Sequence, residues 1–346
     1  MSKHTGQCFF LSCNNYLTSL QINRVYYVSD TKSVTAMKFS DVGEKKVLED
    51  LRSFLPIGDD GFVMPYGGKY LILTSDMIYR PTHILDEMGW AQIGRHIAAI
   101  NFSDIAAMGA KPLAFLLAVC SPDMEEEDFL EFARAADALC KSYGAVYAGG
   151  DLNEADELSL AGFALGETDK PVYKKGARAG DLVCVTGTLG GAALGIEILV
   201  RKLSEEWDNR DLQKILERTL DAKPRVDEGY FLRNHATSMT DVSDSLAVSL
   251  HDIARESGVR LKIELGKIPL PEEGRRLADS LKVDLLEHAL YGGGDYELAF
   301  TLPEERWETV RKKIDASVIG SVNAGTGVSS SRGNIVNRGF EHFAKK

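Results

Sequence analysis

The chain has 346 residues, enough for about two domains with a hydrophobic core in each. Hydrophobic residues make up 44% and charged residues 26%, which is typical of a folded globular protein. A net charge of −11 disfavours binding to nucleic acids, whose phosphates need basic partners. No apolar run approaches the ~20 residues that span a bilayer, so we expect no membrane association. Five scattered cysteines without metal-binding spacing predict a reducing, cytoplasmic location.

The N-terminal segment over residues 1–36 differs in charge from the rest of the chain. It contains three basic residues and one acidic residue, whereas the remainder is strongly acidic. Polar residues interrupt its apolar stretch too early for a secretory signal. We therefore predict a poorly structured extension over 1–36, or a misplaced start with Met37 as the initiator.

Apolar periodicity beyond Met37 predicts alternating helices and strands. In chain order we expect a helix over 47–55, a strand over 70–74, a helix from 93 that ends near Gly109, a strand over 113–119, a helix over 129–140, and strands over 145–148 and 158–165. Asp123 and Glu126 have the spacing of a capping box before the third of these helices.

The second half of the chain continues the alternation. Strands are expected over 182–185, 261–265 and 298–301, and helices over 191–203, 246–257 and 303–314. This order predicts an α/β fold, in the wide sense that includes layered α+β arrangements. A polar stretch at Thr168 to Pro171 suggests a boundary, so we predict domains over 37–168 and 169–346.

The most informative pattern is an apolar stretch that runs into a turn of small residues carrying aspartate. It occurs six times, at Asp59–Asp60, Asp76, Asp104, Asp151, Asp241–Asp244 and Asp295. A single instance is usually only a turn or a helix cap. Six together indicate a shared site, because ligands of α/β folds bind at the carboxyl ends of strands.

Several carboxylates at one place need a counterion, because each like-charge pair at ~4 Å costs about 1 kcal/mol even in water. Mg²⁺ suits the role, since it binds carboxylates together with substrate phosphates. Hydroxyls at Thr74, Ser75, Ser103 and Ser243 suit the same hard-oxygen environment. The residues therefore predict a magnesium–phosphate site without a Walker motif. The turn over 187–191 opens a helix, so its amides either hold an anion or form only a tight turn.

In their order along the chain, these motifs resemble those of the thiamine-monophosphate kinases, whose superfamily includes aminoimidazole ribonucleotide synthetase and selenophosphate synthetase. The resembling segments are Ile57–Asp60, Asn101–Ala110, Gly149–Asp151, Lys175–Asp181, Val185–Gly190, Asp241–Asp244, Gly293–Leu298 and Gly339–Phe343. The resemblance implies a two-domain fold like aminoimidazole ribonucleotide synthetase. Its N-terminal sheet domain would bind ATP and magnesium and form a homodimer, and its C-terminal α/β domain would complete the cleft.

The resemblance also implies an activity and the residues that perform it. The activity is phosphorylation of thiamine phosphate to thiamine diphosphate, with ATP as co-substrate and several Mg²⁺ ions. The implied metal ligands are Asp60, Thr74, Ser75, Asp76, Asp104, Asp151, Asp241 and Asp244. The implied ATP contacts are Gly150, Asp151, Lys174 and Ser243, and the implied substrate contacts are His83 and Phe340. Alternatively, Phe340 fills the core.

No general base is expected, because the acceptor phosphate is already anionic near neutral pH. Catalysis would be direct transfer assisted by metal, with Asp76 and Asp151 as its main carboxylates.

Four positions depart from the family pattern, as does the segment Leu152–Glu154, which lacks the usual Thr-rich, Arg-Gly pattern. Thr74 and Ser75 stand in reverse order. Lys174 replaces a common arginine and so loses the bidentate phosphate contact. Gly294 replaces an acidic residue near the substrate, for which Asp295 or Glu297 would have to compensate. The alternatives are therefore another ATP-dependent kinase or synthetase of the superfamily, or a nucleotide-binding regulator with a decayed site.

Overall fold

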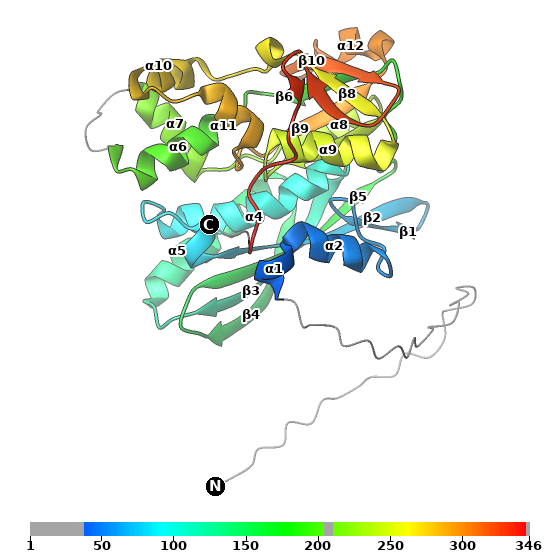
Figure 1. Ribbon diagram of the computed structural model, residues 1–346. Helices are drawn as coiled ribbons and strands as arrows, with labels where there is room; N and C mark the ends of the chain where they lie inside the picture. The colour runs from blue at the N-terminus through cyan, green and yellow to red at the C-terminus, as the bar shows by residue number, and fades with distance from the viewer. Residues whose placement is uncertain (1–37, 204–209, 344–346) are drawn as a thin grey trace, which may run out of the picture.

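Two β-sheets organise the molecule, shown as a computed structural model in Figure 1. The structure describes residues 38–203 and 210–343, so the predicted extension over 1–36 lies outside the described residues. The five-stranded sheet has the order β1-β2-β5-β3-β4, and the seven-stranded sheet has the order β12-β11-β8-β10-β6-β9-β7. Helices lie between and around the sheets, which confirms the predicted α/β fold (Figure 1).

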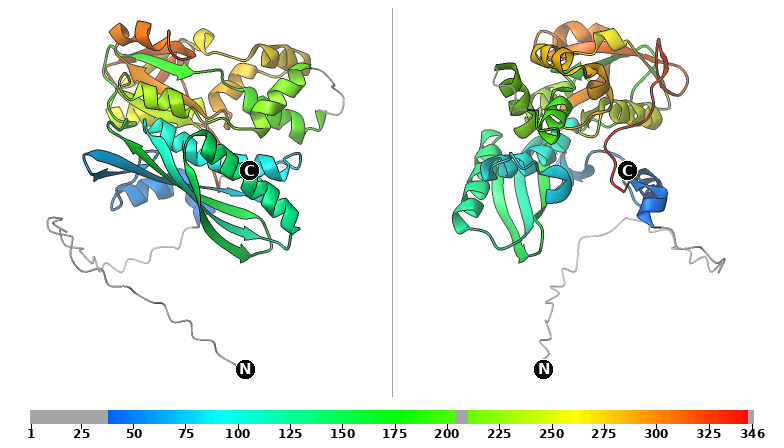
Figure 2. Two further views of the ribbon diagram at one scale, coloured as in Figure 1. Left: turned by 180° about the vertical axis from the view of Figure 1, so that it is seen from behind. Right: turned by 60° about the vertical axis from the view of Figure 1, so that its left-hand side comes forward.

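The five-stranded sheet is formed by the chain before residue 169. Its strands are β1 (Phe62–Tyr66), β2 (Lys69–Tyr79), β3 (Lys111–Ser121), β4 (Val146–Glu154) and β5 (Ser159–Thr168). Strand β5 pairs antiparallel with β2 and β3, and β3 pairs parallel with β4. Helices α4 (Trp90–Ala107) and α5 (Glu126–Ser142) pack on one face of this sheet (Figure 2).

The seven-stranded sheet is formed by the chain after residue 181. Its strands are β6 (Leu182–Thr186), β7 (Ser238–Val242), β8 (Arg260–Ile263), β9 (Glu297–Leu302), β10 (Ala316–Asn323), β11 (Gly327–Ser330) and β12 (Gly333–Asn334). All residues of β7 and β9 are buried, although β7 is the edge strand of this sheet. The predicted boundary at residue 168 stays a prediction.

The helices of the second half surround this sheet. They are α6 (Gly191–Val200), α7 (Arg210–Leu220), α8 (Val226–Leu232), α9 (Leu246–Ser257), α10 (Glu272–Leu281), α11 (Leu285–Tyr291) and α12 (Glu304–Val310), with a 3₁₀ turn, η2 (Leu265–Lys267). Helices α8 and α9 lie on the side that faces α4 (Figure 1). Within the described ranges, no helix combines the length and apolar character needed to cross a bilayer.

The last described residues return to the first ones. Three short helices, α1 (Phe39–Val42), α2 (Glu44–Arg52) and α3 (Arg80–His83), flank the first sheet. The backbone N–H of His342 donates to the Glu44 carboxylate at 3.0 Å, and the rings of Phe39 and Phe343 are 5.2 Å apart. The C-terminal segment therefore connects the second half of the chain back to the first.

The expectation that the aspartates occupy turns after strands is wrong for four of them. Asp76, Asp151 and Asp241 lie inside β2, β4 and β7, and Asp104 lies inside α4. Strand β2 continues past its apolar run because it pairs with β5 along nearly its whole length. Helix α4 continues because its polar side chains find buried partners: the Asn101 amide donates to Ile97 O at 2.9 Å.

The predicted capping box at Asp123 and Glu126 is also wrong. Helix α5 begins at Glu126 after Glu125, which makes no side-chain cap. Three acidic residues in the first turn instead interact favourably with the positive end of the helix dipole.

The contact between α4 and α5 requires glycine at position 94. A Cβ atom there would lie 2.1 Å from Phe132 O. We therefore expect Gly94→Ala to lower the free energy of unfolding by about 1–3 kcal/mol, because the two helices must separate. Denaturant unfolding measures this change. The matched control is Gly89→Ala at the start of α4, where a Cβ meets only the tip of Gln92, 3.8 Å away. Equal stability of the two variants would contradict this account of the packing.

Candidate active site

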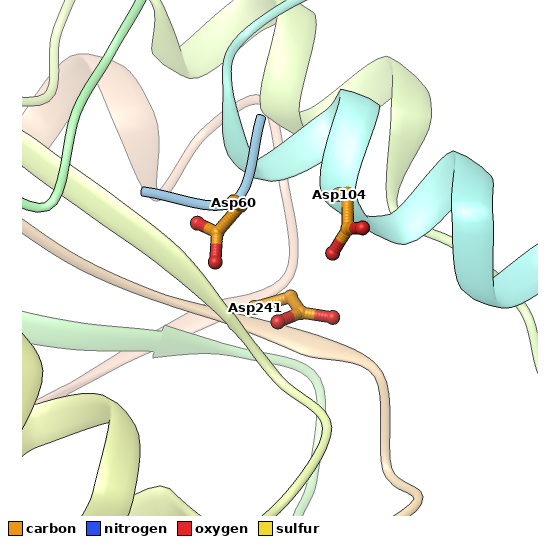
Figure 3. Close-up of side chains that lie close together, drawn as sticks. All are labelled: Asp60, Asp104 and Asp241. Carbon is orange, nitrogen blue, oxygen red and sulfur yellow. The ribbon is translucent and has the colours of Figure 1, made fainter. Parts of the chain in front are cut away.

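Three aspartates from three different elements meet between the two sheets (Figure 3). Asp60 comes from the loop before β1, Asp104 from α4 and Asp241 from β7. One carboxylate oxygen of each lies within 4.8 Å of the others. Figure 3 shows the three carboxylates around a common space. We call these three residues the acidic cluster.

Hydroxyl groups fix the orientation of the acidic cluster. Thr74 donates to Asp104 at 2.5 Å, Thr240 donates to Asp60 at 3.0 Å, and Ser103 donates to Asp241 at 2.7 Å. Ser243 donates to the other oxygen of Asp241 at 3.2 Å. Two predicted site residues, Thr74 and Ser243, therefore contact the cluster directly.

The acidic cluster is electrostatically unfavourable without a cation. Burial, then the charges of Asp241 and Asp76, raise the pKa of Asp104 well above its usual value. Burial and the charge of Asp60 raise the pKa of Asp241 to about 7. Asp104 and Asp241 thus resist ionisation because they are buried and because neighbouring carboxylates are negative. A divalent cation would remove this repulsion.

One oxygen of the cluster lacks a hydrogen-bond partner that a cation would supply. The Asp60 side chain is only 6% exposed, and its Oδ2 atom is buried and accepts no hydrogen bond from residues that the structure describes. A buried carboxylate oxygen without a partner is costly in a native fold. Because the atoms here that could bind a metal are carboxylate and hydroxyl oxygens, the site fits a hard cation such as Mg²⁺.

Lys174 supplies the nearest positive charge. Its Nζ atom lies 2.7 Å from Asp60 Oδ1 and 3.7 Å from Asp252 Oδ2. Its backbone N–H also donates to the Asp59 carboxylate. Burial and the charge of Asp60 raise the pKa of Asp59 to about 6. Lys174, predicted to contact ATP, therefore neutralises part of the acidic cluster.

Asp76 and Asp244 lie at the margin of the cluster. Burial raises the pKa of Asp76, and the charge of Asp60 raises it further, whereas a backbone hydrogen bond lowers it. The Asp76 N–H donates to the Asn101 side chain at 3.0 Å, which ties β2 to α4. Burial and the charges of Glu44 and Asp76 raise the pKa of Asp244 to about 6. Both carboxylates therefore belong to the same electrostatic environment as the cluster.

Ser75 and Asp151 do not join the cluster within one chain. Side chains alternate across a strand, so Ser75 points to the opposite face of the sheet from Thr74 and Asp76. Asp151 pairs with Ala118, whose side chain faces the same uncovered side, and its exposed carboxylate accepts a hydrogen bond from Asn153 at 2.8 Å. Their metal-binding role stays a prediction.

Gly150 lies beside Asp151 on β4, where a side chain has no space. A Cβ atom on Gly150 would lie 1.7 Å from Leu117 O. Close pairing of β4 with β3 therefore explains this glycine, and its contact with ATP stays a prediction.

His83 and Phe340 lie together beside Asp244. Their ring centroids are 5.8 Å apart, and His342 contacts both, at 5.2 Å from His83 and 4.9 Å from Phe340. The Phe340 N–H donates to Asp244 O at 3.3 Å. Phe340 is 44% exposed, so the alternative that it fills the core is wrong. The three rings form an accessible aromatic group next to the acidic residues.

Neither Asp295 nor Glu297 is free to replace the acid that Gly294 lacks. Asp295 accepts the N–H groups of Gly190 and Ala192 and thereby caps α6. The turn over 187–191 therefore already carries a carboxylate at its helix N-terminus. Glu297 accepts hydrogen bonds from Thr186 at 2.6 Å and from Arg225 at 2.7 Å.

Sequence reasoning missed three neighbours of the cluster. Asp59 stands next to Asp60 and was seen only as part of a turn. Thr240 precedes Asp241 in β7. Nothing in the sequence pattern of this buried strand distinguishes Thr240 from its neighbours. Asp252 lies on α9, where nothing in its helical spacing indicates a functional role.

Comparisons with known proteins agree with this architecture. Residues 58–168 match the family described as AIR synthase related protein, N-terminal domain, and residues 178–332 match the corresponding C-terminal domain. The chain is therefore a two-domain protein of the AIR synthase related class.

The relatives narrow the class further. The chain is 36% identical over 293 residues to a thiamine-monophosphate kinase of Pyrococcus horikoshii, covering 83% of this chain and 91% of the relative. It is 39% identical over 288 residues to one of Methanospirillum hungatei, covering 82% and 92%. A solved structure described as "AaThiL complexed with AMPPCP and TMP" superimposes with a TM-score of 0.84 at 30% identity, covering 89% of this chain and 100% of that one. The chain belongs to the thiamine-monophosphate kinase family.

The raised carboxyl pKa values give the metal-free protein a defined pH dependence. The folded chain binds protons at Asp241 up to a pH of about 7, whereas unfolded aspartates lose theirs near pH ~4. We therefore expect the unfolding temperature in EDTA to fall as the pH rises from about 4 to about 7.

Saturating Mg²⁺ should flatten this dependence, because the cation replaces the protons in neutralising the cluster. Thermal unfolding at several pH values, with EDTA and with Mg²⁺, tests the expectation. Asp104→Asn should reduce the slope in EDTA. Identical slopes with and without Mg²⁺ would contradict a cation site at these carboxylates.

Proposed function

We propose that this chain transfers the γ-phosphoryl group of ATP to the phosphate of thiamine phosphate, forming thiamine diphosphate and ADP. The observation that carries the proposal is the acidic cluster of Asp60, Asp104 and Asp241, with its buried, unpartnered oxygen at Asp60. The family membership and the relative solved with AMPPCP and TMP support the same substrates.

Asp60, Asp104 and Asp241 would hold Mg²⁺, with Asp76, Asp244 and the hydroxyl of Thr74 close by. When bound, Mg²⁺ neutralises the charge of the ATP phosphates and of the anionic acceptor. The chain's own residues keep these carboxylates in place: Ser103 and Thr240 donate to them, and Lys174 balances part of their charge. Ser243, which donates a hydrogen bond to Asp241, would contact the nucleotide.

The reaction needs no general base from the protein. A phosphate monoester has a second pKa of ~6 and is already nucleophilic near neutral pH. The chain therefore contributes positioning and charge neutralisation, which is the usual division of work in phosphoryl transfer. Among the residues assigned here, none has to accept a proton.

His83 and Phe340 would contact the thiamine part of the acceptor. Their rings lie next to Asp244 and so beside the acidic residues. An aromatic face attracts a cation, and the thiazolium ring of thiamine is cationic. Because Asp295 and Glu297 already accept hydrogen bonds from other groups, we assign recognition of the thiamine rings to this aromatic group.

We expect Asp241→Asn to lower turnover by about 100- to 1,000-fold, because the cluster loses a charged ligand. The assay follows thiamine diphosphate by chromatography with ATP, Mg²⁺ and thiamine phosphate, and free thiamine is the comparison acceptor. Asp137→Asn, on the exposed face of α5, is the matched control.

The possible outcomes distinguish the proposed activity from the alternatives. Near-normal turnover of Asp241→Asn at saturating Mg²⁺ would refute its role as a metal ligand. ADP formed without thiamine diphosphate would favour another kinase or synthetase activity of the superfamily. No turnover of ATP by the wild-type chain would favour a nucleotide-binding regulator.

The uncovered face of the first sheet supports a homodimer. Leu73, Met77, Leu116 and Phe163 alternate onto this face, and each is at least 42% exposed. Folded monomers seldom expose a contiguous apolar surface of this kind. A second copy packed on this face would also cover Ser75 and Asp151, which gives these two predicted ligands a place near an interface.

Phe163→Lys should convert the dimer to monomer, because a charge at the centre of the face would be buried without a partner. Light scattering coupled to gel filtration measures the mass. Val200→Lys, an exposed apolar residue on α6, is the control and should leave the mass unchanged. A wild-type monomer, or a dimeric Phe163→Lys variant, would contradict this interface.

A cytoplasmic location is proposed with this function. The three cysteines that the structure describes, Cys120, Cys140 and Cys184, are free, which is typical of a reducing compartment.

A further inference from the structure

Tyr296 has a backbone conformation that a bulky side chain seldom adopts. Its φ angle is +50°, in the left-handed region. Glycine adopts this conformation without steric cost, and Tyr296 follows a run of three glycines from which only Asp295 separates it. Strain of this kind persists only where the surrounding structure imposes it, and it concentrates at functional sites.

The loop before Tyr296 packs closely against the end of β7, the strand that carries Asp241. The Gly294 N–H donates to Ser243 O at 2.7 Å, and the Tyr296 N–H donates to Val242 O at 3.0 Å. A Cβ atom on Gly293 would lie 2.5 Å from Ser243 O, so the two backbones are in close contact. The position of Tyr296 is therefore fixed relative to the acidic cluster.

The ring of Tyr296 crosses from the second sheet to α4. It packs edge-on against His96, with centroids 5.8 Å apart and an angle of 76° between the planes. Burial lowers the pKa of His96 to about 4, so this imidazole is neutral near pH 7. Helix α4 also carries Asp104, about two turns further along. The same helix therefore positions the ring and one carboxylate of the cluster.

The hydroxyl of Tyr296 is a donor in an acidic environment. Burial raises the pKa of this phenol well above its usual value, and four carboxylates raise it further: Asp76, Asp241, Asp244 and Asp104. The phenol therefore keeps its proton. Within residues 38–203 and 210–343 the hydroxyl has no hydrogen-bond partner.

We propose that the Tyr296 hydroxyl donates a hydrogen bond to a phosphate oxygen of the bound acceptor and so positions it beside the acidic cluster. This inference rests on the proposed function and adds a contact to it. A phosphate that enters a space lined by carboxylates is repelled, and a neutral donor there stabilises it without adding negative charge. The retained side chain explains why tyrosine, rather than glycine, occupies a strained position.

Tyr296→Phe tests the proposal, because it keeps the ring, its contact with His96 and the backbone strain while it removes the hydroxyl. We expect kcat to fall about 100-fold, as for the loss of a donor to a reacting phosphate or oxyanion. The KM for ATP and the unfolding temperature should stay close to those of the wild-type enzyme. The control is Tyr143→Phe, whose hydroxyl donates to Pro224 O at 3.1 Å, at another contact between the two halves.

A second measurement separates positioning from folding. Calorimetric binding of thiamine phosphate, in the presence of Mg²⁺ and a non-hydrolysable ATP analogue, should weaken about tenfold in Tyr296→Phe and stay unchanged in Tyr143→Phe. Turnover of Tyr296→Phe within twofold of wild type would overturn the proposal. A lower unfolding temperature together with a higher KM for ATP would also overturn it, since both indicate a structural role.

Failure of the proposed function gives a different result. In that case the wild-type chain forms no thiamine diphosphate at all. Binding of inorganic phosphate to the Mg²⁺-loaded wild-type and Tyr296→Phe chains then decides the matter. Weaker binding by the variant would support the phosphate contact, and equal binding would overturn it.

Discussion

Repulsion among buried carboxylates is the constraint on which the arrangement of this molecule depends. Asp60, Asp104 and Asp241 each place a carboxylate oxygen within 4.8 Å of the others. Burial raises the pKa of all three, and neighbouring carboxylates raise the pKa of Asp104 and Asp241 further. Such a cluster persists only if rigid elements hold it and neighbouring groups offset its charge. Hydroxyl donors and Lys174 provide that offset, and substrate and metal would complete it.

Helix α4 is the element that makes the cluster rigid. It is buried along most of its length, and several of its polar residues have specific partners in the fold. Asn101 fixes the backbone of Asp76, Ser103 fixes Asp241, and His96 packs against Tyr296. Because Gly94 lets α5 approach closely from the other side, α4 is held between the first sheet, α5 and the second half of the chain.

The sequence predicted the fold class, the ranges of many elements, and aspartates that need a cation. It could not show that Asp76 and Asp104 lie at the cluster whereas Ser75 and Asp151 do not. The face to which a strand residue points depends on the pairing register, and a single apolar run does not determine that register. It placed aspartates in turns because polar residues in strands and helices are usually exposed, whereas here Asn101 and Ser103 have buried partners. Helix α7 was missed although its apolar residues have helical spacing, since its many charges obscured them.

The acidic cluster also sets an order on folding. Its members lie at positions 60, 104 and 241, so ribosomal synthesis must pass β7 before all three carboxylates exist in one chain. The first sheet needs only residues before 169, and its local pairings form at lower entropic cost than contacts across the chain. A nascent chain would therefore carry a folded first half with two uncancelled charges, Asp60 and Asp104. The contacts between the halves, and above all the hydrogen bond from the His342 N–H to Glu44, can form only after nearly the whole chain has been synthesised.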